Sequence, residues 1–114
     1  MNKQLTGYTI RQVREGRIRV TYASASLTLH RISDEHWVLE DLRSEVRRKG
    51  HANGVMTAAC LWADSELVTL TLKVVSTGGP RGMDNLRLYM FYRKFGFVAD
   101  RTERYSHTVM RRNP

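Results

Sequence analysis

Residues 45–54 read EVRRKGHANG, so that three basic residues, Arg47, Arg48 and Lys49, run straight into Gly50 and an Ala-rich segment. The apolar residues that follow recur at helical spacing and predict a heavily buried helix. A basic, glycine-containing loop that opens a helix presents unpaired backbone N–H groups and the positive end of the helix dipole, which favours an anion. The same pattern also describes a solvated charged turn, which is the commoner case. The apolar residues of the predicted helix are Ala52, Val55, Met56, Ala58, Ala59, Leu61, Trp62 and Ala63.

Strands are predicted on the N-terminal side of this loop. From Tyr8 to Ile32 apolar and polar residues alternate, which indicates an antiparallel meander. Residues 33–36 form a polar turn, and Trp37 to Arg43 is interpreted as a buried strand that carries two carboxylates. Alternation along that strand predicts Glu40 and Asp41 on opposite faces.

The C-terminal half contains a strand, a second helix and two further strands. Residues 68–74 alternate strictly, with the apolar members facing inward. A Gly- and Pro-rich loop at 76–83 precedes a helix that Asp84 caps and Gly96 ends. The order of strands, helix, strand, helix and strands predicts one mixed α/β (α+β) domain over residues 1–114. The apolar face of this second helix is formed by Leu88, Phe91, Tyr92 and Phe95.

The composition and charge indicate which kinds of partner and which cellular location to expect. The 114 residues carry a net charge of +8, and Arg greatly outnumbers Lys, so an anionic partner is expected. No apolar run could cross a bilayer, the N-terminus lacks a secretory signal, and Cys60 has no partner for an internal disulfide; we therefore expect a cytoplasmic protein. Neither zinc-finger spacing nor the aromatic RNA-recognition signature is present.

The basic loop differs from the P-loop and Rossmann patterns, which need other glycine spacings. It resembles the acyl-CoA signature of the GNAT superfamily of N-acetyltransferases, Arg/Gln-x-x-Gly-x-Gly/Ala, through Arg47, Gly50 and Ala52. A second resemblance lies in NLRLYMFYRKFGF, residues 85–97, whose residues are in step with the Asn and Tyr-x-Lys-x-Gly-Phe elements of that family. The resemblance covers about residues 37–112. It implies a mostly antiparallel mixed sheet flanked by helices, and acetyl transfer from acetyl-CoA to an amine through a ternary complex.

The resemblance also implies roles for particular residues. Tyr92 matches the tyrosine that protonates the leaving thiolate; by periodicity alone its position on the apolar helix face is nearly as typical of a core aromatic, and the register of the motif favours the first interpretation. The strand residues 37–43 would pair with the pantetheine arm, with a backbone N–H near Leu42 facing the thioester oxygen. The side chain of His51 is interpreted as a solvent-facing loop residue without a catalytic role. The expected cofactor-binding set is Leu42, Arg47, Arg48, Lys49, Gly50, His51, Ala52, Asn85 and Tyr92.

A general base is also needed, because an amine with a pKa near 10 must lose a proton before attack. Glu40 is the first candidate and Asp41 the second, since burial in an apolar strand would raise a carboxyl pKa toward a useful value. A strand carboxylate paired with an arginine is an equally good interpretation. Cys60 is interpreted as a packing residue, and the four His residues lack metal-ligand spacing, so no metal is expected.

The chain departs from the family where two helices normally separate the first two strands, since Tyr8 to Tyr22 leaves no room for them. The acceptor side is therefore expected to be open, or to be completed by a second subunit or by the substrate, which favours a macromolecular acceptor. The alternative is a non-catalytic basic module that keeps the fold and binds nucleic acid. A homodimer and a nucleic-acid-associated acceptor are both compatible with the sequence.

Overall fold

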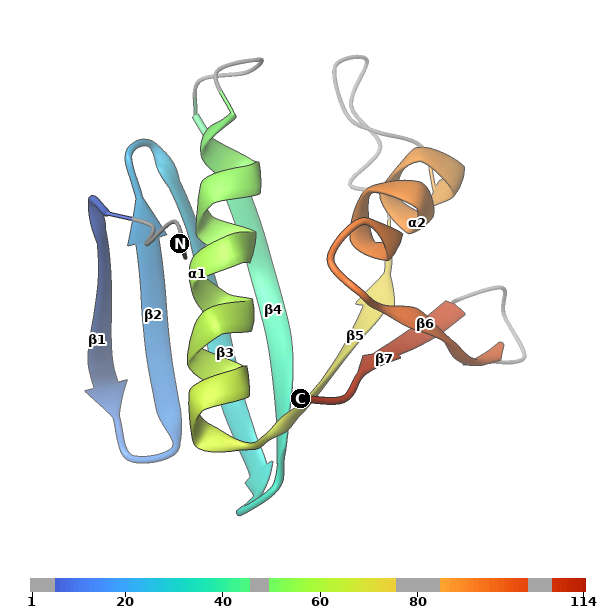
Figure 1. Cartoon of the computed structure of the whole chain (residues 1–114), viewed down its shortest axis with the longest axis horizontal. Coiled ribbons are helices and arrows are strands. Elements are labelled where there is room, and N and C mark those ends of the chain that lie inside the picture. The colour runs from blue at the N-terminus through green and yellow to red at the C-terminus, as the bar shows by residue number, and fades with distance from the viewer. Residues whose placement is uncertain (1–5, 46–49, 76–84, 103–107) are drawn as a thin grey trace, which may run out of the picture.

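The computed structural model describes residues 6–45, 50–75, 85–102 and 108–114, which form a sheet with helices on one side (Figure 1). The seven-stranded sheet has the order β1-β2-β3-β4-β5-β7-β6. This mixed, mostly antiparallel architecture confirms the fold class predicted from the sequence. The elements are β1 (Tyr8–Arg14), β2 (Arg17–Tyr22), β3 (Ala25–Ser33), β4 (His36–Ser44), α1 (His51–Glu66), β5 (Thr69–Val74), α2 (Asn85–Arg93), β6 (Val98–Thr102) and β7 (Thr108–Arg112).

The first three strands form the antiparallel meander that the alternation from Tyr8 to Ile32 predicts, and β4 continues it. β1 and β2 are joined by a tight turn in which Gly16 has a φ of 73°, a backbone conformation that suits glycine. The β1–β2 connection is too short to hold a helix. β1 pairs with β2, β2 with β3 and β3 with β4, each in antiparallel register.

β4 and β5 are parallel neighbours that separate after a short stretch of pairing. Their ladder joins His36 to Thr69, Trp37 to Leu70 and Val38 to Thr71, and it ends there. Residues 39–44 of β4 therefore have no partner in β5, and Figure 1 shows β5 turning away from β4 toward the C-terminal strands. On its other side β5 pairs with β7 along the full strand, from Leu70 to Val74.

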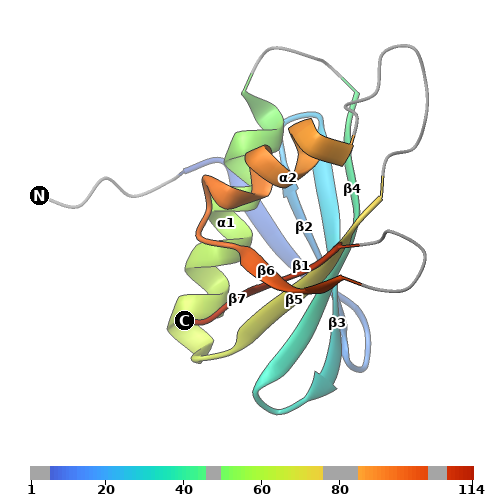
Figure 2. The same cartoon turned by 90° about the vertical axis from the view of Figure 1, so that its right-hand side faces the viewer.

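Both helices cover the same side of the sheet (Figure 2). Lys94, just after α2, lies with its Nζ atom 3.5 Å from Oδ1 of Asn53 in α1. The core between helices and sheet contains the predicted apolar residues, including Val55, Met56 and Leu70, each with no exposed surface. The inward positions of β5, Leu70, Leu72 and Val74, are buried as the alternation predicts.

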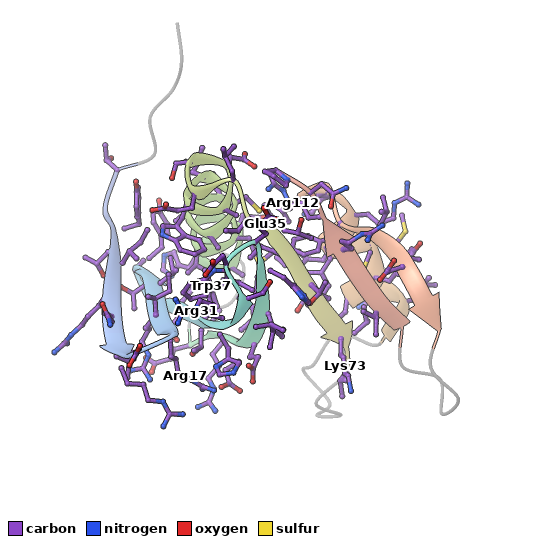
Figure 3. The ribbon with its side chains drawn as sticks, turned by 90° about the horizontal axis from the view of Figure 1, so that it is seen from below. Arg17, Arg31, Glu35, Trp37, Lys73 and Arg112 are labelled. Carbon is purple, nitrogen blue, oxygen red and sulfur yellow. The ribbon has the colours of Figure 1, made fainter. Side chains whose placement is uncertain are left out.

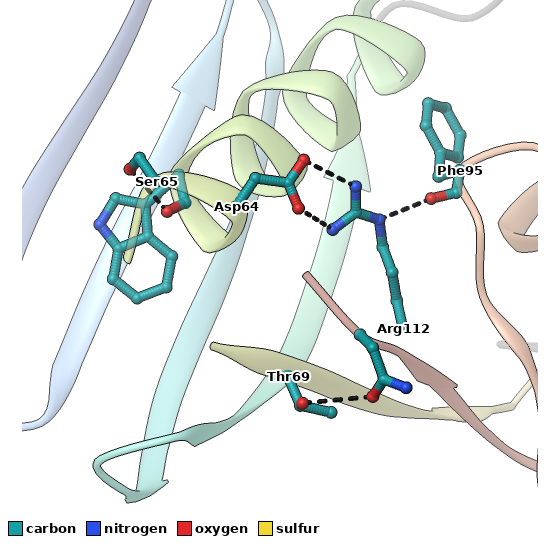
Figure 4. A network of polar contacts seen from close by, with 7 residues as sticks. Asp64, Ser65, Thr69, Phe95 and Arg112 are labelled. Carbon is teal, nitrogen blue, oxygen red and sulfur yellow. Dashed lines mark hydrogen bonds and ion pairs between the residues drawn. The ribbon is translucent and has the colours of Figure 1, made fainter. Parts of the chain in front are cut away.

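Arg112 of β7 links the two helices to the end of the sheet (Figure 4). Its Nη1 and Nη2 atoms donate to the two carboxylate oxygens of Asp64 in α1, at 2.8 and 3.0 Å. Its Nε atom donates to the carbonyl oxygen of Phe95, just beyond α2, at 2.7 Å. One planar guanidinium thus fixes α1 and the α2–β6 connection relative to β7.

The opposite side of the sheet, which we call the open face, is covered by no helix of the described residues (Figure 2). It consists of the strand positions that alternate with the core positions. Strand register assigns to it Thr9 and Arg11 of β1, Arg17, Arg19 and Thr21 of β2, Ser26, Thr28 and His30 of β3, His36, Val38, Glu40 and Arg43 of β4, Thr69, Thr71 and Lys73 of β5, Val98 of β6, and Val109 and Arg111 of β7, and the ion pair with Arg111 adds Asp100 of β6.

Within the described ranges, no helix combines the length and apolar character needed to cross a lipid bilayer.

Candidate functional site

A bulge interrupts β4 on the segment that has lost its partner in β5. Thr28 pairs with Glu40 and Ser26 with Arg43, so β4 holds one more residue than β3 between these two pairs. Asp41, inside the bulge, has a φ of 56°, a left-handed conformation that Asp tolerates better than most residues. Strict alternation along this strand is therefore wrong, because Glu40 and Arg43 lie on the same face although three positions apart.

The bulge changes which backbone groups are available. An extra residue in one strand is left out of the ladder, so the peptide groups around Asp41 and Leu42 are not fully used by β3. On the other edge, β5 pairs with β4 only up to Val38. Residues 39–44 thus present strand edge that an extended ligand could pair with, and Leu42 is half-buried against the core beside it.

The start of α1 has the features of an anion site. Gly50 occupies the N-cap position with φ 74° and ψ 11°, and no side chain caps the first turn. The first turn also contains no acidic residue. The first helical hydrogen bond runs from the Gly54 N–H to the Gly50 carbonyl at 3.0 Å. The N–H groups before Gly54 therefore point along the helix axis toward whatever lies above it, with the positive end of the dipole.

His51 is the first residue of α1, and it is half-buried. Its interpretation as a solvent-facing loop residue is therefore wrong. Its Nδ1 atom lies 2.8 Å from Oγ of Ser24, and the Ser24 backbone N–H donates to the same atom at 3.4 Å. The ring also meets Tyr22 edge-on, with centroids 6.3 Å apart. These contacts fix the first turn of α1 to the β2–β3 turn, a positioning role that its place in a basic loop did not reveal.

Gly54 allows the second contact between α1 and β2. A Cβ atom at this position would lie 2.3 Å from ring atoms of Tyr22, so only glycine lets the ring pack against the helix backbone. The glycine that weakens the first turn by helix propensity thus has a packing reason. A glycine at helical spacing inside an Ala-rich stretch was the sequence signal for this close approach.

Tyr92 lies on the inner face of α2, with only 7% of its surface exposed. Its ring meets Phe91 at 5.5 Å and Phe97 at 6.1 Å between centroids. Burial raises the pKa of the Tyr92 hydroxyl above its usual value of 10.0. The hydroxyl is therefore protonated at neutral pH. Phe91 is buried as predicted, and Leu88 and Phe95 are half-buried against the core.

Glu40 lies on the other side of the sheet from Tyr92. Its register opposite Thr28 assigns it to the open face, where it is half-buried, whereas Asp41 in the bulge is exposed. The structure therefore brings the two carboxylates to the unpaired end of β4. It does not bring them to the face that holds Tyr92.

Several predicted residues lie outside the described part of the chain. These are Arg47, Arg48 and Lys49 of the basic loop, the Asp84 cap and the side chain of Asn85. Ala52 is described and is half-buried in the first turn of α1.

Cys60 is buried in α1, and desolvation raises its pKa to about 11, so its thiol is neutral and inert at physiological pH. Its interpretation as a packing residue agrees with this environment. The described residues contain no group of three His, Cys, Asp or Glu residues that could hold a metal ion.

Comparison with solved structures identifies the architecture. The anti-CRISPR protein AcrVA5 superimposes with a TM-score of 0.68 at 13% identity, over 84% of this chain and 97% of that one. A GNAT family acetyltransferase from Elizabethkingia anophelis with acetyl-CoA bound gives 0.66 at 11% identity, over 95% and 99% of the two chains. An aminoglycoside 6'-N-acetyltransferase complexed with coenzyme A gives 0.65 at 14% identity, over 88% and 74%.

The sequence identities are low, but the superpositions establish a GNAT-like fold. No family model matches the chain, and no curated protein matches it by sequence. In this chain the GNAT-like fold has a β1–β2 connection that holds no helix.

Proposed function

We propose that this GNAT-fold protein is an N-acetyltransferase that transfers an acetyl group from acetyl-CoA to an amine on a macromolecular acceptor. The observation that carries the proposal is the open edge of β4 at residues 39–44, which lies beside a helix that starts with an uncapped first turn. An extended arm with amide groups and a terminal diphosphate is the kind of ligand that matches a strand edge together with a helix N-terminus.

The first turn of α1 would hold the diphosphate. Backbone N–H groups there can donate to phosphate oxygens, and Gly50 leaves space because a Cβ at this position would have no atom within 4 Å. Arg47, Arg48 and Lys49 of the adjoining loop add the positive charge that a diphosphate needs. Neither an acidic side chain nor a capping side chain of the first turn competes with the ligand.

The unpaired segment of β4 would hold the pantetheine arm and the reacting group. Acetyl-CoA supplies a thioester carbonyl, whose oxygen becomes negative when an amine attacks. A backbone N–H in the bulge, near Leu42, is a suitable donor because it is not fully engaged by β3. Such donors lower the barrier most where they are already oriented before the reaction.

Proton transfer would involve residues on opposite sides of the sheet. The amine approaches and the thiolate leaves on different sides of the tetrahedral carbon, so a base and an acid on different faces suit the reaction. Glu40 of the open face would take a proton from the amine, directly or through water, with exposed Asp41 as the second candidate. Tyr92, kept protonated by burial, would give a proton to the thiolate.

The acceptor would approach from the open face. The short β1–β2 connection leaves this face without a helix, so a large acceptor can reach the unpaired end of β4 there. A macromolecular amine, such as a lysine side chain or a protein N-terminus, would fit an exposed surface better than a small metabolite, which needs an enclosing pocket.

Thermal stabilisation by acetyl-CoA tests the proposal. At a concentration about 100 times the Kd, a ligand stabilises a native protein by about 2.7 kcal/mol, or roughly 10 °C in Tm for a domain of this size. Gly50→Ala is the matched control for Gly50→Glu, because both variants bear the same backbone strain at φ 74°. We expect Gly50→Ala to keep most of the shift and Gly50→Glu, which places a carboxylate at the diphosphate site, to lose it. No shift in the unmodified protein at millimolar acetyl-CoA would contradict the proposal.

A further inference from the structure

The open face has an unusual distribution of charge. Its charged side chains in the described strands are basic except for Glu40 of β4 and Asp100 of β6, whose carboxylate lies 3.7 Å from Arg111. Figure 3 shows Arg17 and Lys73 projecting from the side of the sheet away from α1, whereas Arg112 lies on the helix side. The net charge of +8 is therefore concentrated in part on one exposed surface. The basic residues of the face are Arg11, Arg17, Arg19, Arg43, Lys73 and Arg111.

Two of these arginines repel each other when no anion is bound. Arg11 of β1 lies directly opposite Arg19 of β2 in the antiparallel ladder, and both are exposed. Like charges directly opposite each other on one face repel, and they destabilise a strand pair. An anion bound between them would relieve that repulsion.

Arg17 supplies a further unsatisfied donor. Its Nη2 atom lies 3.4 Å from Nδ1 of His30 on the neighbouring strand. Its Nε atom is buried and has no hydrogen-bond partner among the described residues. A buried donor without a partner costs free energy, and outward movement of the Arg17 side chain would let a phosphate oxygen accept from it.

The centre of the open face carries small hydroxyl and imidazole side chains. The hydroxyls of Thr9 and Thr21 hydrogen-bond to each other, and Nε2 of His36 lies 2.7 Å from Oγ1 of Thr71. Thr28 of β3 is 7% exposed, so the face is closely packed around it. Threonine and arginine together are typical of contacts to the phosphate backbone of nucleic acids.

The face lacks the groups that other partners need. The described aromatic residues of the strands, Tyr8, Tyr22 and Trp37, have the opposite register and pack on the helix side. Without aromatic side chains the open face offers no stacking platform for unpaired bases. It also lacks the aromatic anchors that carry binding energy at protein interfaces.

We propose that the open face binds the phosphate backbone of double-stranded nucleic acid without reading its base sequence. From β2 to β7 the face crosses four strand spacings, or about 20 Å at 4.8 Å each, and a duplex carries one charge per about 1.7 Å. A duplex length of about 20 Å therefore carries on the order of ten phosphates in total, and those on its near side can contact the face. This inference deepens the proposed function, on which its last step rests, because duplex bound there would bring an associated protein amine to Glu40.

Fluorescence anisotropy with a labelled random-sequence 20-base-pair DNA duplex tests the inference in the full chain. Because each phosphate contact contributes about 0.9 to the slope of log K against log salt, we expect Arg11→Gln/Arg19→Gln to reduce the slope by about 2 and affinity by about tenfold. Arg87→Gln/Arg93→Gln removes the same charge from α2, and we expect it to bind like the unmodified protein. Melting curves check that each variant folds.

Three results would overturn the inference: equal weakening by the α2 variant, an unchanged salt slope in the Arg11/Arg19 variant, or equal competition by polyglutamate or by the single strand of the same sequence. The acetyl-CoA shift is measured in parallel on the same samples. Duplex binding without an acetyl-CoA shift would support the duplex-binding face and contradict the proposed acetyltransferase activity. An acetyl-CoA shift without duplex binding would support the proposed activity and contradict the duplex-binding face.

Discussion

Gly54→Ala should destabilise the protein, although helix propensity alone favours alanine. The ideal Cβ at position 54 lies 2.3 Å from both Cδ1 and Cε1 of Tyr22 and 2.8 Å from Cγ. Carbon atoms normally approach to about 3.5–4.0 Å, so the ring must retreat by about 1 Å or more. All three atoms belong to one rigid ring, and therefore no rotation of a flexible end relieves the contact.

The magnitude follows from opposing effects. Replacing glycine by alanine inside a helix gains up to about 1 kcal/mol. Overpacking a well-packed site costs about 1–3 kcal/mol. Movement of Tyr22 also disturbs the neighbouring hydrogen bond between Ser24 and His51, which is worth about 0.5–1.5 kcal/mol. We therefore expect a net loss of about 1–3 kcal/mol in the free energy of unfolding.

A double-mutant cycle measures this effect by thermal and denaturant unfolding. It compares the unmodified protein, Gly54→Ala, Tyr22→Ala and the double variant. For a domain of this size 1 kcal/mol corresponds to about 4–8 °C, so Gly54→Ala should lower Tm by at least about 5 °C. In a Tyr22→Ala background the clash is gone, and the same Gly54→Ala change should raise stability by up to about 1 kcal/mol. Equal effects in the two backgrounds, or a raised Tm in the single variant, would refute the close approach of the ring to α1.

Three further changes test other parts of the structure. Arg112→Lys keeps the charge but loses the paired hydrogen bonds to Asp64, so it should lower the free energy of unfolding by about 1–3 kcal/mol. The control Arg111→Lys, at an exposed position, should lower it little. Equal losses in the two variants would contradict the linking role of Arg112. Burial raises the Cys60 pKa from 9.0 to about 11, so the folded state holds this proton more tightly; its contribution is complete below pH 9 and is lost as pH rises to 11. Cys60→Ala should therefore flatten the decline of stability over that range by up to about 3 kcal/mol, and an unchanged decline would argue against it. Tyr92→Phe should lower turnover by about 10²–10⁴ while the acetyl-CoA thermal shift persists; full turnover would exclude Tyr92 as the proton donor.

Much of the fold could be predicted because the buried side of a strand or helix requires apolar residues at regular spacing in the sequence. The alternation of residues 68–74 predicts β5 with its buried face, and the spacing of Leu88, Phe91 and Tyr92 predicts the inner face of α2. Gly96, with a φ of 93°, marks the end of that helix for the reason expected, because few other residues adopt this conformation.

The prediction of the site was less complete, because its main features depend on contacts between distant segments. The bulge at Asp41 breaks the alternation of β4, but no glycine or proline in the sequence marks its position. Only the register of β4 with β3 shows the bulge. His51 looked like part of a charged loop, but its partner Ser24 lies in another turn that the fold brings alongside. The roles of Glu40, Asp41 and Tyr92 are still predictions, and the basic loop at 46–49 lies outside the described residues.

The sequence by itself determined the kinds and order of the secondary-structure elements, the glycine at the start of α1 and the excess of arginine, since these follow from local periodicity, backbone sterics and charge. Only the tertiary structure decided that β4 and β5 part after Val38 and that the basic residues of β1, β2, β4, β5 and β7 share one uncovered face. Both depend on strand register and sheet twist, which arise from the packing of many segments and leave no signal in any one of them.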